Sequence, residues 1–174
     1  RPYEVMTVKW DQYPEEPPIG WIHWFNIFID MSEFLTAYTK TAKTEGGYVN
    51  DPADNGGETW KGIARKFHSL WSGWAVIDGY KKVSWPKSNK EITKLLNTDI
   101  PLENKVHEFY KKEFWNKMRG DEIVTQFLAD KLYDNCVNFG VSGGIKITQE
   151  SITMPKTGIM DDATLTKLNQ GRTV

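Results

Sequence analysis

Three residues with catalytic potential lie close together in the sequence. Glu45 is followed after nine residues by Asp54, and after five more by Thr59. Glycines at 46–47 and 56–57 flank the segment between them, and they allow tight turns and a close approach of backbone to a ligand. A carboxylic acid paired with a carboxylate across a cleft is the arrangement that hydrolyses glycosidic bonds. This spacing therefore makes acid–base cleavage of a sugar chain the first hypothesis.

Glu45 has the features of a general acid. The segment from Ser32 to Gly46 has the apolar spacing of an amphipathic helix, and Glu45 falls at its C-terminal end on the face of Phe34 and Tyr38. Burial there disfavours the carboxylate, and the negative end of the helix dipole acts in the same direction. Both effects raise the pKa of Glu45, which favours proton donation to a leaving sugar oxygen. The simpler alternative is a solvated carboxylate at a helix end.

Two interpretations stay open for Asp54 and Thr59. In an inverting glycosidase the two carboxyl groups stand about 6.5–9.5 Å apart with a water between them. Asp54 could activate that water while Thr59 orients it. Alternatively, the run Asp54-Asn55-Gly56 forms only a turn, and Thr59 caps the start of a following helix.

The run from Glu45 to Thr59, followed by Lys61-Gly62-Ile63, resembles glycoside hydrolase family 108. That family comprises bacterial and phage N-acetylmuramidases of lysozyme type, and the resemblance rests on a Glu-Gly-Gly-Tyr box and a Gly-Gly-x-Thr turn. Asn55 departs from it, because the family usually has proline there. The spacing of glutamate, aspartate and threonine is also similar to that of phage-type endolysins, in which the three act together.

The resemblance implies a fold, a reaction and a catalytic residue. The expected fold is mainly α, an α+β lysozyme-like fold with a helical bundle-like core and a small turn or hairpin after the catalytic helix. The expected reaction is hydrolysis of the β-1,4 bond between N-acetylmuramic acid and N-acetylglucosamine in peptidoglycan, with Glu45 as the acid. No metal and no organic cofactor are expected.

Four further residues are candidates for binding the glycan. Tyr48, Trp71 and Trp74 could line a sugar cleft, because aromatic faces pack on pyranose rings, although each could equally belong to the core. Asn138 lies in a segment, 134–165, that resembles the predicted peptidoglycan-binding region found in the same family. Its amide could donate hydrogen bonds to an N-acetyl group or a peptide stem, or it could instead cap a helix or pack in the interior.

We expect three regions along the chain. They are an N-terminal extension of unknown role at 1–30, a lysozyme-like catalytic region at 31–118, and a helical peptidoglycan-binding-like region packed on it at 119–174. After the first helix, periodicity and capping signals predict further helices at 58–67, from Ser88 to 96, at 102–118, 123–140, 145–152 and 161–168. Residues 69–87 show no clear period, and we expect them to be irregular.

The composition excludes several other classes of function. Twenty-two basic and 23 acidic residues give a net charge of −1, which argues against nucleic acid as the main partner. The chain has no apolar run of about 18 residues, so membrane insertion is not expected. One cysteine and three scattered histidines offer no zinc motif.

We therefore expect a monomer that acts on peptidoglycan at the bacterial cell wall and is released without a classical secretory signal. Two alternatives remain: a non-catalytic peptidoglycan-binding or secretion-accessory protein, and a lytic transglycosylase, which needs the glutamate but no aspartate to activate water.

Overall fold

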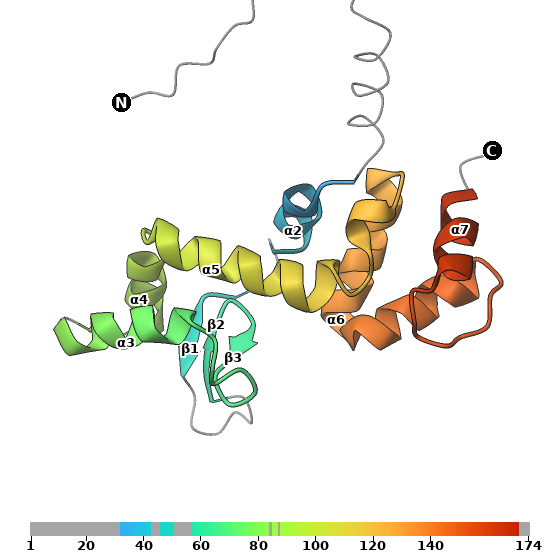
Figure 1. Cartoon of the computed structure of the whole chain (residues 1–174). Coiled ribbons are helices and arrows are strands. Elements are labelled where there is room, and N and C mark those ends of the chain that lie inside the picture. Colours follow the sequence, from blue (N-terminus) through green and yellow to red (C-terminus); the bar gives the residue numbers. More distant parts are fainter. Residues whose placement is uncertain (1–31, 43–45, 51–56, 84, 87, 171–174) are drawn as a thin grey trace, which may run out of the picture.

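A computed structural model of the chain describes residues 32–42, 46–50, 57–83, 85–86 and 88–170. The expected N-terminal extension, Glu45 and Asp54 lie outside these residues. The described elements in chain order are α2 (Phe34–Ala42), β1 (Tyr48–Asn50), β2 (Glu58–Trp60), β3 (Ile63–Ala64), α3 (Gly73–Val83), α4 (Asn89–Leu96), α5 (Ile100–Tyr110), the π-helix η2 (Lys111–Trp115), the 3₁₀ turn η3 (Gly120–Glu122), α6 (Gln126–Ser151) and α7 (Asp162–Gln170) (Figure 1). The expected mainly helical α+β class, with a hairpin after the first helix, is confirmed.

The three short strands form one antiparallel sheet in the order β1-β2-β3. Tyr48 pairs with Trp60, and Trp60 pairs with Ile63, so these three side chains share one face and are buried. Val49 pairs with Thr59 on the opposite face. The predicted helix over 58–67 is therefore wrong, because pairing with the distant residues 48–50 decides the conformation of this segment.

Helix α3 occupies part of the segment that we expected to be irregular. Gly73, Trp74 and Ile77 form its buried face. The next helix, α4, begins at the predicted capping box: the backbone N–H of Glu91 donates to the Ser88 hydroxyl, which in turn contacts the Glu91 carboxylate at 2.8 Å. The start of α4 could be predicted from this local motif. Helix α3 could not be predicted, because its sequence has two glycines and a poor apolar period.

Helix α5 continues directly into the π-helix η2. The backbone N–H of Asn116 donates to the carbonyl of Lys111, five residues earlier, at 2.8 Å. The wider turn brings Trp115 onto the buried side five residues after Tyr110, and Trp115 is completely buried. The predicted helix over 102–118 is thus correct in place but contains a change of helical type.

The first half of α6 packs along α2, and the two helices run in the same direction. Glu33 N–H donates to Gln126 at 2.6 Å, Lys40 pairs with Asp130, and the Thr41 hydroxyl lies 3.3 Å from the Asp134 carboxylate. Phe34 and Tyr133 add an edge-to-face ring contact. Ser32, just before α2, donates its hydroxyl to the carbonyl of Gly120 at 2.5 Å and so links α2 to η3.

A kink at Gly140 divides α6 in two. Gly140 has φ 75° and ψ 157°, a backbone conformation that favours glycine. The predicted helices over 123–140 and 145–152 are therefore joined as two arms of one element, as Figure 1 shows. Beyond them, the Asp161 carboxylate accepts from Thr164 N–H at 2.8 Å and begins α7 as predicted. No helix of the described residues is long and apolar enough to span a membrane.

Candidate active site

The structure describes part of the predicted catalytic segment, residues 46–50 and 57–59. Glu45 follows the last residue of α2, Ala42, by three positions and immediately precedes Gly46. Gly47 then packs so closely on Thr93 of α4 that a Cβ at this position would overlap the threonine side chain. The second glycine of the Glu-Gly-Gly-Tyr box is therefore required by packing. Asp54 belongs to the connection between β1 and β2.

Thr59 is the predicted catalytic residue that the structure describes. It lies in the middle of β2, partly exposed, on the face of the sheet that points away from the buried Trp60. Its hydroxyl donates to the carbonyl of Gly57 at 3.3 Å. Thr59 is a strand residue and does not cap a helix, so that alternative is excluded.

A cavity of about 450 Å³ opens beside Gly46, between α2, α4 and α5. Tyr38 and Gly46 line it together with a polar group formed by Lys61, Glu103 and His107. Lys61 pairs with Glu103 at 2.6 Å, and His107 Nε2 lies 3.3 Å from the second oxygen of the same carboxylate. The His107 ring meets Tyr38 edge to face at 4.7 Å. Sequence reasoning missed this group, because Lys61, in the turn between β2 and β3, lies about 40 residues before Glu103 and His107 of α5.

A second charged network fixes the sheet to α3. The Glu58 carboxylate accepts from Tyr48 at 2.9 Å and from Arg65 at 2.8 Å, and it also pairs with Lys81. Arg65 in turn binds Asp78 through two parallel hydrogen bonds of 2.7 and 2.6 Å. The fork geometry of the guanidinium makes this a strong, directional pair.

The network shifts the pKa of each acid that it holds. Burial raises the pKa of Glu58, but hydrogen bonds from Lys81, Arg65 and Tyr48 outweigh burial, and the net shift is downward. The hydrogen bonds from Arg65 lower the pKa of Asp78 to about 2. Burial, and then the neighbouring Glu58 carboxylate, raise the pKa of Tyr48. Glu58 is thus held as a carboxylate for structural reasons, and it does not have the raised pKa of a general acid.

The four predicted glycan-binding residues have different environments in the structure. Tyr48 and Trp74 are 3% and 2% exposed, so neither ring offers a face to a sugar; for both, the core role is the one observed. Trp71 is partly exposed and lines a different cavity, described next. Asn138 is exposed near the Gly140 kink and donates its amide to the carbonyl of Asp134 at 2.9 Å. It is not a buried packing amide.

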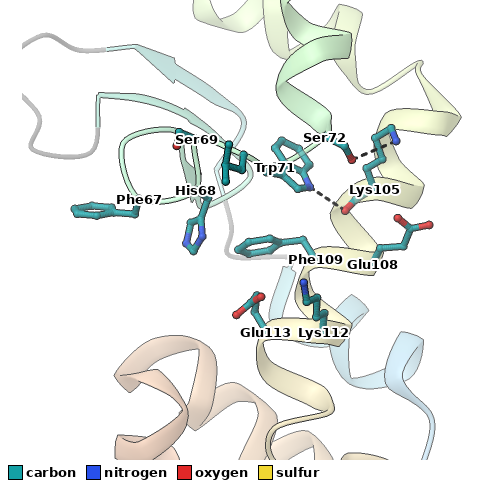
Figure 2. Close-up of a pocket in the computed structure, with 11 residues that line it drawn as sticks. Phe67, His68, Ser69, Trp71, Ser72, Lys105, Glu108, Phe109, Lys112 and Glu113 are labelled. Atoms are coloured by element: carbon teal, nitrogen blue, oxygen red, sulfur yellow. Dashed lines mark hydrogen bonds between the residues drawn. The ribbon is translucent and has the colours of Figure 1, made fainter.

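Trp71 lines a cavity of about 500 Å³ between the 67–72 segment and the outer face of α5 and η2 (Figure 2). Its indole N–H donates to the carbonyl of Lys105 at 3.2 Å. The Phe109 ring lines this cavity, with the His68 ring 4.7 Å from it (Figure 2). The two cavities lie on opposite faces of α5: Lys105 and Phe109 line this one, and Glu103 and His107 line the one beside Gly46.

Within the described residues, no group of three or more His, Cys, Asp or Glu could hold a metal ion.

The arrangement is that of a lysozyme-like fold: a short antiparallel sheet follows α2, α4 packs against β1, and α6 packs against α2. A solved structure titled as that of Brucella abortus SagA has a similar fold, with a TM-score of 0.50 and 24% sequence identity over 79% of this chain and 68% of that chain. No curated protein matches the chain.

Residues 38–140 match the family model described as glycosyl hydrolase 108. This match spans more than half of the chain, and the protein therefore belongs to the glycosyl hydrolase 108 family. It is accordingly a glycoside hydrolase.

Proposed function

We propose that this glycoside hydrolase is an N-acetylmuramidase that cleaves the β-1,4 bond between N-acetylmuramic acid and N-acetylglucosamine in peptidoglycan. The observation that carries the proposal is the extent of the family match. Residues 38–140 include the whole segment from Glu45 to Thr59, so the three candidate catalytic residues lie inside the matched region. The substrate places the protein's action at the bacterial cell wall.

Glu45 is the proposed general acid. It protonates the glycosidic oxygen as the bond from that oxygen to the anomeric carbon breaks, which gives the leaving sugar a neutral hydroxyl group. Two observations support this role. Glu45 directly precedes Gly46, which lines the cavity of about 450 Å³. The other glutamate of the motif, Glu58, is already engaged by Tyr48, Arg65 and Lys81.

Asp54 and Thr59 are proposed to direct the water. The water oxygen attacks the anomeric carbon, and Asp54 accepts the proton that this water loses. Thr59 supports this assignment, because its side chain lies on the face of the hairpin opposite the core. Asn50 pairs with Glu58 at the end of the strands where the 51–57 connection joins them, and Asp54 is the middle residue of that connection in the sequence.

The type of product tests the proposal. Purified protein is incubated with peptidoglycan sacculi in water enriched in ¹⁸O, and the released muropeptides are analysed by mass. A muramidase gives reducing muramic acid ends that carry one heavy oxygen. Anhydro-muramic ends without the label would instead show a lytic transglycosylase, and no release from several wall types would favour a peptidoglycan-binding or accessory role.

A further inference from the structure

The cavity of Figure 2 has an aromatic wall that the proposed catalytic step does not use. The rings of His68 and Phe109 meet edge to face with centroids 4.7 Å apart, and the Trp71 ring lies 6.3 Å from Phe109. The cavity holds about 500 Å³, which is within the range of small-molecule sites. Phe67 and Leu70 at its rim are 67% and 98% exposed, so apolar surface extends outward from it.

Trp71 is held rigidly in this wall. Its indole N–H donates to the carbonyl of Lys105, its ring meets Trp74 edge to face at 5.3 Å, and a Cβ at Gly73 would overlap it. The ring therefore has one position before any ligand arrives. A preorganised aromatic surface loses little conformational entropy on binding.

The rim of the cavity carries balanced charge. Lys105, Lys112, Glu108 and Glu113 line it; Lys105 donates to the Ser72 hydroxyl at 3.3 Å, and Glu113 pairs with Lys117 at 2.5 Å. Within the described part of the chain, Glu108 and Lys112 form no salt bridge. Two cations and two anions give the site no preference for a strongly charged ligand, but they supply both donors and acceptors for hydroxyl and amide groups.

The π-helix contributes to this arrangement. Lys112 and Glu113 of η2 line the cavity, whereas Trp115 of the same segment is buried. Single π-turns occur often at functional sites. The π-helical turn therefore lies where polar side chains line the cavity.

We propose that this cavity is a subsite for an uncharged N-acetylhexosamine unit of the glycan strand, which packs on the rings of His68, Trp71 and Phe109 and hydrogen-bonds to Glu108 and Lys112. A pyranose combines an apolar face of C–H groups with a rim of hydroxyl groups, and the cavity offers the matching pair of surfaces. The inference rests on the proposed function for its substrate class. It assigns the N-acetylglucosamine units to this cavity, since they lack the carboxylate of muramic acid.

The test measures binding without turnover. The ¹⁵N-labelled Glu45→Gln protein is titrated with the N-acetylglucosamine trimer and followed by NMR, with the Trp71 indole N–H assigned through Trp71→Phe. We expect the Trp71 signal to shift. His68→Ala and Glu108→Ala should each weaken the trimer at least about fivefold, the effect of losing one contact of about 1 kcal/mol.

Two matched variants serve as controls. Phe127→Ala removes an aromatic ring that is 69% exposed on α6, and Glu150→Ala removes an exposed carboxylate; both should bind the trimer as the parent does. The subsite is refuted if His68→Ala and Glu108→Ala bind like these controls, or if the shifts centre on the cavity beside Gly46. Shifts at Trp71, together with no release from sacculi by the parent protein, would support the subsite and refute the muramidase proposal. Cleavage of sacculi by the parent protein, without shifts at Trp71 in the titration, would refute the subsite alone.

Discussion

At the scale of single residues, the contacts of Glu58 give this glutamate of the motif a structural role. Glu58 is held as a carboxylate by Tyr48, Arg65 and Lys81, and it joins the hairpin to α3. Glu45 is predicted to be the acid from the helical period that precedes it in the sequence and from the family resemblance. The sequence alone did not distinguish Glu58 from a helix-starting residue, because its partners lie up to 23 residues away.

The Arg65–Asp78 pair predicts a specific loss of stability in acid. The pKa of Asp78 is lowered to about 2 by its hydrogen bonds from Arg65, against 3.8 as the ordinary value. A lowered pKa in the folded state gives stability that is complete above pH 4 and is lost as the pH falls towards 2. Melting temperatures measured across this range should fall less steeply for Asp78→Asn than for the parent protein. Parallel curves would contradict the assignment.

At the scale of elements, the sequence predicted helix starts and breaks correctly where the contacts that stabilise them are local. The capping box at Ser88, the cap at Asp161 and the break at Gly140 were all readable from a few neighbouring residues. The strands at 58–64 were not, because three-residue strands are defined by pairing with partners elsewhere in the chain. Nor did the sequence reveal the π-turn or the cavity beside Gly46, since both depend on packing between elements.

The Gly140 kink predicts opposite effects for two glycine substitutions. Open space surrounds a Cβ at both Gly140 and Gly79, so packing does not distinguish them. Gly140→Ala should destabilise the protein by about 1–2 kcal/mol, because alanine disfavours the φ of 75°. Gly79→Ala, inside α3, should stabilise it by about 0.5–1 kcal/mol through helix propensity. Urea unfolding of the two variants checks the sign of each effect, and a shared sign would refute the argument.

At the scale of the whole molecule, contacts tie the expected catalytic and C-terminal regions together. Phe34 and Trp115 both contact Tyr133 of α6. The family match runs to residue 140, and so past the expected boundary at 118. At the far end, buried Gln149 binds Thr157, Ile159 and Thr164 through its amide N–H groups, and it accepts from Gly158 N–H at 2.9 Å. The expected division at 118/119 remains a prediction about sequence regions.

These contacts predict one cooperative unfolding transition. Gln149→Ala should lower the free energy of unfolding by about 2–3 kcal/mol, because it leaves several buried polar partners unsatisfied. Calorimetry should show the whole transition moving to lower temperature, with the calorimetric and van't Hoff enthalpies still equal. The exposed neighbour provides the control, Glu150→Ala, which should change the midpoint little. A separate low-temperature transition in the Gln149 variant would show that the C-terminal region unfolds independently.

The central claim is that Glu45 donates the proton in glycan cleavage, and the rate of muropeptide release by Glu45→Gln tests it most directly. Removing a general acid should lower the rate between about 100- and 10,000-fold while the melting temperature stays close to that of the parent. Glu150→Gln, a change to an exposed glutamate paired with Lys156, should cleave sacculi as the parent does. Release by a folded Glu45→Gln protein within about twofold of the parent rate would contradict the claim, since a lost general acid costs far more than that.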